Sequence, residues 1–220
     1  MKQLGAYRVL LVVCAIASVA ACATDPIAPP QAMTGPTVAL DAFATGLSKP
    51  PVSVGDVFVY NNPVERREVI AVGQHFIDYI YGPESYAKTT WSPILPRLRW
   101  TAPMSAGNAK LTKVSGQLHP LSKGNRIVFI EEAMRSRPGK ATRNTWECEV
   151  QEKIEITVAA GSSDTWQILC KIDGRERVLY NYAEDIGAVV RMIYALEGGQ
   201  QVVRQLTGYA SGSQQSETDN

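Results

Sequence analysis

The sequence predicts an all-β protein, which we expect to be a single antiparallel, strongly curved sheet, a half-barrel or a sandwich of about 10–12 short strands. Between residues 54 and 209, segments rich in β-branched and aromatic residues alternate with clusters of Gly, Pro, Asn and Asp. No segment keeps a 3.6-residue apolar period for more than two turns, which argues against long helices. Apolar residues make up 45% of the 220 residues and charged residues 20%, so a disordered chain is excluded.

Residues 1–21 have the layout of a secretory signal peptide. Lys2 and Arg8 precede thirteen apolar or small residues, 9–21, and a transmembrane helix needs about 20. The sequence at the end of this stretch, Val19-Ala20-Ala21-Cys22, resembles the bacterial lipobox. The resemblance implies cleavage before Cys22, a diacylglycerol on its thiol and an acyl chain on its amine, enough lipid for a stable membrane anchor. The alternative is an ordinary cleavage site with an incidental cysteine.

Residues 22–53 are expected to form a tether outside the folded domain. They are rich in Pro, Ala and Thr, a composition that favours extended segments over a packed core. Ala23 stands where an Asp would resemble the inner-membrane retention signal of Gram-negative bacteria, so we expect the outer membrane. Residues 210–220 are small, polar and acidic, and we expect a disordered tail. The β domain is therefore assigned to residues 54–209.

The first half of this domain contains four expected strands, at residues 56–61, 67–72, 75–81 and 86–91. Turn-forming sequences separate these strands: Asn61-Asn62-Pro63, Gly73-Gln74 and Gly82-Pro83. The next segment, residues 92–100, contains two prolines, which cannot donate to a β-ladder, so we expect an edge strand or a loop there. A further strand at residues 110–114 precedes Gly116.

The second half is expected to add strands at residues 125–133, 146–158, 165–172, 177–182, 188–196 and 201–207. Residues 137–140, 159–163 and 198–199 provide turns. Asp173-Gly174 is the strongest hairpin signal in the chain, because both residues tolerate the positive φ that a two-residue turn requires. Along residues 146–158 the apolar face is broken only by Glu152.

Cys148 and Cys170 lie on the apolar faces of neighbouring expected strands, in an oxidising compartment if the chain is exported. A hairpin that turns near Gly161 pairs residues whose numbers sum to about 323, whereas 148 and 170 sum to 318. A bulge or an asymmetric loop would place the two cysteines opposite each other. We expect a disulfide, with two buried free thiols as the alternative. No histidine or second cysteine pair has the spacing of a metal site, so we expect no metal.

Four segments share an order of motifs with other proteins: LHPLSKGNRIVF at residues 118–129, TWECEV at 145–150, VAAGSSDTWQILC at 158–170 and VLYNYAEDIGAVVR at 178–191. Together they resemble a loose group of bacterial periplasmic or lipoprotein β domains of uncharacterised function. The resemblance covers about a third of the chain. Its motifs are turn and core residues, so it implies a β fold and no particular chemistry.

The net charge is near zero but changes sign along the chain. Loss of residues 1–21 would remove two of the 22 basic residues and none of the 21 acidic ones, which leaves a charge of −1. Residues 64–143 contain 13 Lys and Arg against 6 Asp and Glu, whereas residues 144–220 contain 6 against 12. Either oppositely charged strands of these two halves pair with each other, or the basic half provides a patch for anionic lipids or an envelope polymer. Without a global basic field, we expect no nucleic acid.

The sequence contains no recognised catalytic motif. His75 and His119 are the only histidines, and neither has a Ser or Cys partner at a known spacing. We therefore predict that the protein is not an enzyme and has no cofactor beyond the acyl groups on Cys22. Aromatic residues would either pack the core or line an apolar cavity. The candidates for such a lining are Trp91, Trp100, Trp146, Trp166, Tyr180 and Tyr182.

These observations predict a lipid-anchored protein on the periplasmic face of the outer membrane of a Gram-negative bacterium. It would be a non-catalytic binding or assembly factor, with the membrane, another envelope protein or a lipid as its partner. One alternative is a carrier of apolar ligands or lipoproteins, similar in architecture to the lipoprotein-localisation chaperones. The other alternative is a hydrolase of envelope polymers.

Overall fold

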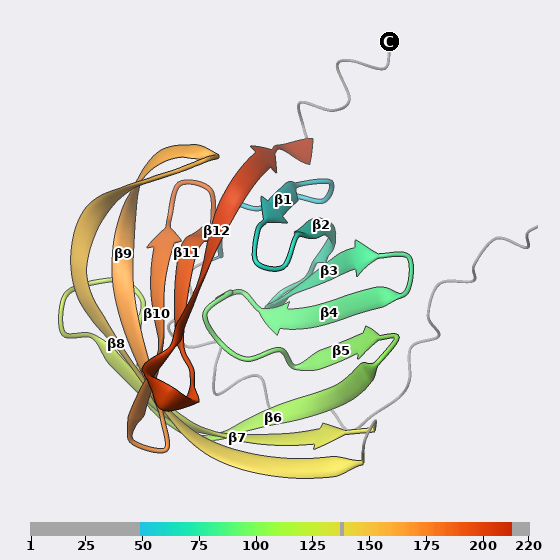
Figure 1. The fold of residues 1–220 in the computed structure, drawn as a ribbon, viewed down its shortest axis with the longest axis vertical. Coiled ribbons are helices and arrows are strands. Elements are labelled where there is room, and N and C mark those ends of the chain that lie inside the picture. The colour runs from blue at the N-terminus through green and yellow to red at the C-terminus, as the bar shows by residue number, and fades with distance from the viewer. Residues whose placement is uncertain (1–48, 137–138, 213–220) are drawn as a thin grey trace, which may run out of the picture. The chain divides into compact units, whose positions relative to one another are not determined.

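The computed structural model describes residues 49–136 and 139–212. The predicted signal peptide, Cys22, most of the tether and most of the tail lie outside these ranges. Within them, twelve strands form one closed barrel, and each is antiparallel to the next (Figure 1). The strands are β1 (Val57–Tyr60), β2 (Glu65–Val72), β3 (Phe76–Gly82), β4 (Ser85–Thr90), β5 (Arg99–Ala102), β6 (Ser105–Gly116), β7 (Arg126–Arg135), β8 (Lys140–Val158), β9 (Gly161–Ile172), β10 (Arg175–Ala183), β11 (Ala188–Ala195) and β12 (Gln201–Ala210).

The barrel is closed by pairing of the first strand with the last. β1 pairs with β2 on one edge and with β12 on the other, where Val57 lies opposite Ala210 and Phe58 opposite Tyr209. The prediction of an antiparallel all-β fold is confirmed. The half-barrel and sandwich forms of that prediction are wrong, because both edges of β1 are hydrogen-bonded and no edge strand remains in the described barrel.

The observed strands agree with the expected segments except where the sequence is polar. The segment with two prolines is a loop at residues 91–98 followed by the four-residue strand β5. β8 starts at Lys140 rather than Trp146, because its polar first residues pair with β7 although they show no apolar alternation. Asp173 and Gly174 form the predicted hairpin turn, with φ of 51° and 75°.

The disulfide between Cys148 and Cys170 is present, and the two Cα atoms are 4.1 Å apart. The β8–β9 turn lies at residues 159–160, and Val158 pairs with Gly161. The numbers of paired residues near the turn therefore sum to 319. The register then shifts between Val150 and Lys153, which lowers the sum to 318 and places the cysteines opposite each other. The expected bulge thus exists, but the turn is tighter than residues 159–163.

One end of the barrel is closed by loops that fold inward. Small barrels of eight strands are filled by their own side chains, and a larger ring leaves space inside. Here the β4–β5 loop, residues 91–98, enters the barrel and buries Ile94, Leu95 and Leu98; we call it the plug loop. The β6–β7 loop at the same end buries Leu118 and Leu121.

The described residues of the predicted tether also contact this closed end. Pro50 and Val52 are buried, and they lie so close to Gly187 that a Cβ there would come within 3.0 Å of both side chains. Gly187 has a φ of +62° in the β10–β11 turn. The tight packing therefore depends on the missing side chain of a glycine. No helix within residues 49–136 and 139–212 is long and apolar enough to cross a membrane.

Candidate ligand-binding cavity

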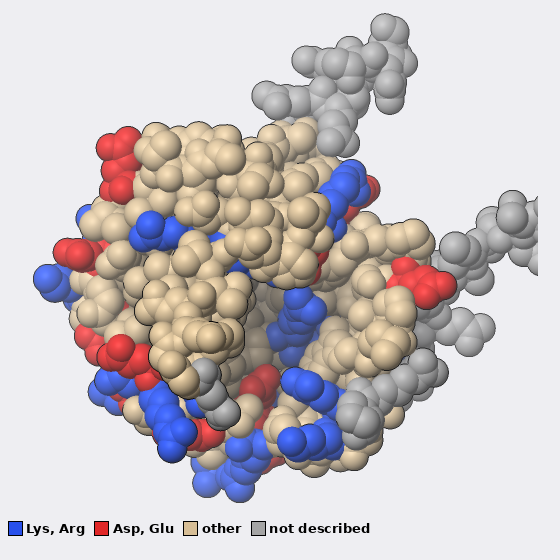
Figure 2. Space-filling model, in the orientation of Figure 1, with Lys and Arg blue, Asp and Glu red and all other residues tan. Residues whose placement is uncertain are grey.

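The barrel contains a cavity of about 890 Å³ at the end opposite the closing loops. Figure 2 shows the molecule hollowed at this face, with blue Lys and Arg side chains around and inside the hollow. Most connections at this end are short, such as the two-residue turns at 83–84, 103–104 and 173–174. Short turns cannot fold inward, so this end stays open. The plug loop lines the cavity from within through Ile94, Leu95 and Arg97.

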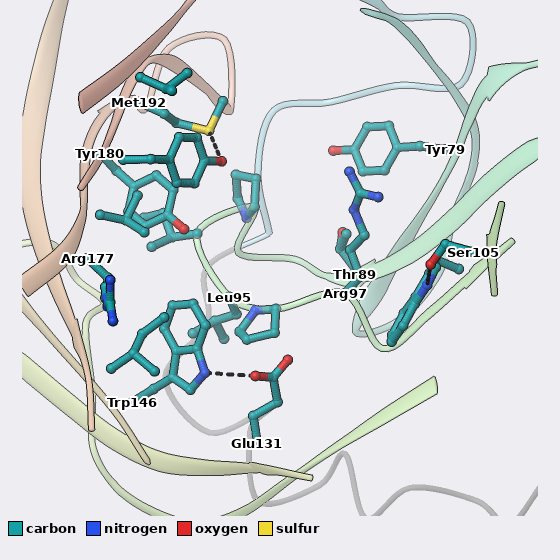
Figure 3. A pocket seen from close by; sticks show the side chains of 18 of the residues that line it. Tyr79, Thr89, Leu95, Arg97, Ser105, Glu131, Trp146, Arg177, Tyr180 and Met192 are labelled. Atoms are coloured by element: carbon teal, nitrogen blue, oxygen red, sulfur yellow. Dashed lines mark hydrogen bonds between the residues drawn. The ribbon is translucent and has the colours of Figure 1, made fainter. Parts of the chain in front are cut away.

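One side of the cavity is apolar. Ile172 of β9, Val178 of β10, Met192 of β11 and Val202 of β12 line it, and we call these four residues the apolar side. Tyr180 lies among them, and Figure 3 shows it on the same wall as Met192. Burial raises the pKa of the Tyr180 hydroxyl, which therefore stays protonated at neutral pH.

The opposite side carries alternating arginines and tyrosines. Arg204 of β12 lies 5.0 Å from the Tyr60 ring, and Arg67 of β2 lies 4.5 Å from the same ring and 5.3 Å from that of Tyr81. Arg97 then lies 4.8 Å from the Tyr81 ring. These five residues, which we call the basic stack, come from the neighbouring strands β12, β1, β2 and β3 and from the plug loop. Of the five, Arg67, Tyr81 and Arg97 line the cavity. Each contact is a cation–π interaction worth about 0.5–2 kcal/mol.

A single carboxylate lies within the basic stack. Arg67 Nε donates a hydrogen bond of 2.6 Å to Glu65 Oε1, and Arg204 Nη2 forms an ion pair with the same oxygen at 2.8 Å, without hydrogen-bond alignment. Burial alone would raise the pKa of Glu65, but the two arginines outweigh it and hold that pKa below its ordinary value. Three guanidinium groups against one carboxylate leave the stack with two surplus positive charges.

Arg97 of the basic stack and two further arginines surround the opening. Arg97, Arg135 and Arg177 line the cavity, and none of them forms an ion pair with another described residue. The one acidic residue of the lining is Glu131, which accepts hydrogen bonds from Trp146 Nε1 at 2.9 Å and Asn144 Nδ2 at 3.1 Å (Figure 3). The cavity is therefore electropositive, and its unpaired charges are at its mouth.

A smaller groove of about 300 Å³ adjoins the cavity at the rim. Tyr81, Arg97 and Trp100 line both spaces. The groove is otherwise formed by the β1–β2 turn, the start of β4 and the outer residues of β2 and β5, including Arg66 and Tyr86. A ligand group placed at Arg97 can therefore extend over the rim into the groove.

The structure brings three of the six predicted aromatic residues together. Trp100, Trp146 and Tyr180 line the cavity. Trp100 lies opposite Gly107 of β6, where a Cβ would come within 2.5 Å of the indole. The remaining three lie elsewhere: the indole of Trp91 donates to the Gly73 carbonyl, that of Trp166 donates to Glu184, and Tyr182 packs edge-on against His119.

Neither histidine lines the cavity. His75 packs against Trp91 with ring centroids 5.3 Å apart. His119 is buried in the β6–β7 loop, and burial lowers its pKa, with Glu184 acting in the opposite direction. Both lie in loops at the closed end, so the geometry does not place an imidazole where a ligand in the cavity would meet it. Among the described residues, no group of three His, Cys, Asp or Glu side chains is arranged to hold a metal.

The arginines are the site residues that the sequence analysis missed. Arg67 occupies an inward position on β2, in step with Glu65 and the fully buried Val69. A charged pair at inward positions of a strand is a sequence signal that could have identified this wall, because charges are excluded from a filled core. Arg97 gives no such signal, since it lies on a loop whose path into the barrel depends on tertiary structure.

Comparison with protein-family models gives no match for this sequence, and neither does comparison with curated proteins. Among solved structures, the chain is similar to the crystal structure of the hypothetical lipoprotein YmcC from Escherichia coli K12. The TM-score is 0.47 and the sequence identity 10%, over 78% of this chain and 90% of that one. At this level the similarity says nothing about the ligand or the activity of the present chain.

Proposed function

We propose that this protein is a non-catalytic ligand-binding protein of the bacterial envelope, which holds a small molecule in the open end of its barrel. The cavity carries this proposal: its volume of about 890 Å³ lies in the range of small-molecule sites. Such sites combine apolar and aromatic walls with a few convergent polar groups. Here the apolar side and the basic stack supply both.

We further propose that the barrel is attached through lipid on Cys22 to the periplasmic face of the outer membrane, with residues 23–48 as the connection. The Val19-Ala20-Ala21-Cys22 sequence supports the anchor. The Cys148–Cys170 disulfide supports an oxidising compartment such as the periplasm. The binding partner would then be an envelope lipid or another envelope component, and no bound cofactor is required.

The proposal is tested by crosslinking from inside the cavity in intact cells. Tyr194, which lines the cavity, is replaced by p-benzoylphenylalanine, whose aromatic ring is close to tyrosine in shape. After illumination, mass spectrometry of the purified full chain should show an adduct of small-molecule mass. We expect this adduct because a ligand in the cavity lies beside the benzophenone.

The matched control places the same photoreactive residue at Tyr209, a half-exposed tyrosine near the end of β12 that does not line the cavity. The control should give only the background adducts of a surface position. Identical adducts at both positions, or no adduct at position 194, would contradict a ligand in the cavity.

A further inference from the structure

The two sides of the cavity differ in chemistry, and this difference indicates the class of ligand. The basic stack lies on β12, β1, β2, β3 and the plug loop, and Arg135 of β7 and Arg177 of β10 add positive charge at the mouth. The apolar side lies on β9 to β12. A ligand that satisfies both sides must be amphiphilic, because neither a free ion nor a hydrocarbon uses the whole lining.

The charge of the polar side specifies the head group. The cavity lining contains four arginines, Arg67, Arg97, Arg135 and Arg177, against the single carboxylate Glu131, which leaves three surplus positive charges. Glu131 is already engaged by two hydrogen-bond donors. Planar guanidinium groups match carboxylate and phosphate oxygens, so the complementary head group is anionic.

Arg97 is the residue best placed to meet that head group. It is exposed at the mouth, forms no ion pair with another described residue, and is oriented by stacking 4.8 Å from the Tyr81 ring. In Figure 3 its side chain rises from the plug loop toward Tyr79, across the cavity from Tyr180 and Met192. Since Arg97 also lines the rim groove, a head group larger than a simple anion can extend outward from it.

We infer that the cavity binds an anionic amphiphile, with the acidic head at Arg97 and the apolar tail along Ile172, Val178, Met192 and Val202. This inference rests on the proposed function, because it names the ligand class of the same cavity. Carboxylate and phosphate heads share the negatively charged oxygens that a guanidinium group recognises, and neutral and cationic heads lack them.

The test compares probes with the same twelve-carbon tail and different heads, each below its micellar concentration. These are dodecyl phosphate, dodecyl maltoside and dodecyltrimethylammonium, with inorganic phosphate as the head alone. Binding to the purified full chain is followed by tryptophan fluorescence, since Trp100 and Trp146 line the cavity, and near-UV circular dichroism confirms that the fold persists. We expect dodecyl phosphate to bind at least tenfold more tightly than any other probe.

Two pairs of variants assign the head and the tail. Arg97→Gln should weaken the binding of dodecyl phosphate about tenfold by removing a charge-assisted hydrogen bond. Arg99→Gln, two residues later at the start of β5 and outside the cavity lining, should leave this binding unchanged. Val202→Asn should weaken the binding of dodecyl phosphate and of dodecyl maltoside by the same factor, because both probes have the same tail. Its control is Val203→Asn, at the neighbouring exposed position.

Each other outcome overturns the inference. If dodecyl maltoside binds as tightly as dodecyl phosphate, the ligand needs no anionic head. If inorganic phosphate binds as tightly, the ligand needs no apolar tail. Equal effects of the Arg97 and Arg99 variants would place the head group elsewhere. If no probe binds while the cavity crosslink still captures a small molecule, the ligand class is wrong and the ligand-binding function stands. If the crosslink is also absent, both fail.

Discussion

At the scale of single residues, the unusual feature is a group of charges inside a barrel wall. Glu65 and Arg67 both point inward from β2, and Arg204 joins them from β12. Placing charges in the interior is costly unless they are paired and hydrogen-bonded. Arg67 and Arg204 gain the Tyr60 ring as a further partner. The buried Nε of Arg204 has no hydrogen-bond partner within the described residues.

Because the arginines hold the pKa of Glu65 low, its contribution to stability depends on pH. Ionised Glu65 stabilises the folded state above the unfolded pKa of about 4.5, and this contribution is lost as pH falls through the lower folded pKa. Glu65→Gln should therefore lower the free energy of unfolding at pH 7 by about 3 kcal/mol. The difference from the wild type should shrink below pH 4.5. Urea titrations at a series of pH values measure it.

Glu68→Gln provides the control for this prediction, since Glu68 pairs with Arg66 on the outer surface of the same strand. That change should cost less than about 1 kcal/mol at every pH. Equal effects of the two variants would show that the internal ion pair has no special role.

At the scale of elements, the plug loop determines the shape of the cavity. Its turn is held by the Leu95 amide, which donates to the Ser92 carbonyl, and by the Leu98 amide, which donates to the Lys88 carbonyl. The two prolines of the segment keep it out of the β-ladder. The loop thus replaces a stretch of strand with apolar side chains that fill the centre of the barrel, and the cavity lies beside them at the open end.

Ile94 tests whether the plug loop is part of the core. Only 1% of its surface is exposed, so Ile94→Ala should lower the free energy of unfolding by about 2–4 kcal/mol. Ile70→Ala, at a 43% exposed position on β2, should change it by less than about 1 kcal/mol. Denaturant unfolding with both variants is the measurement, and an Ile94 variant as stable as the Ile70 variant would mean that the loop does not pack inside.

At the scale of the whole molecule, closure depends on one short strand. β1 has four residues, and it pairs with β12 about 150 residues later in the chain. The register shifts between Val59 and Tyr60, where the Tyr60 ring enters the basic stack. The wall that carries the positive charge is therefore assembled across the seam of the barrel.

A second disulfide across the seam tests this closure. Val59 lies opposite Gly208, and a Cβ at residue 208 would be 3.8 Å from the Val59 Cβ, the mean separation in disulfides. The pair Val59→Cys with Gly208→Cys should therefore oxidise without loss of folding. The crosslink should raise the free energy of unfolding by up to about 4 kcal/mol, because it closes a long loop. Mass spectrometry and thermal unfolding measure the two effects.

Val59→Cys with Gln201→Cys is the control, since residue 201 lies at the far end of β12. It should remain reduced under the same conditions. If both pairs oxidise to the same extent, or neither does, β1 is not held against β12 in this register.

Much of the fold could be predicted from local sequence, because strands and turns have local signals. Asp173-Gly174 is an example, since two residues suffice to define a hairpin. The disulfide was predicted correctly, although the assumed turn at residues 159–163 was too wide and the bulge between Val150 and Lys153 could not be located. A bulge is decided by packing on both sides of a strand and has no reliable signature in one strand alone.

The cavity could be predicted only in part. Trp100, Trp146 and Tyr180 were candidates because aromatic residues line ligand sites. Trp91, Trp166 and Tyr182 have the same residue types and line no part of it, since they belong to other positions along the barrel axis. The aromatic residue type does not determine where a side chain lies along the barrel axis. That position depends on the register of every strand in the barrel.

Local sequence was enough to predict the all-β class, the positions of most strands and the cysteine pair, and it provides the candidate anchor at Cys22, because each depends on residues close together or on a short motif. The folded structure was needed to show that β1 meets β12, that the plug loop fills one end, and that arginines from β2, β12 and the plug loop stack with tyrosines on one wall of the barrel. These features are contacts between residues far apart in the chain, and local propensity and periodicity carry no information about such contacts.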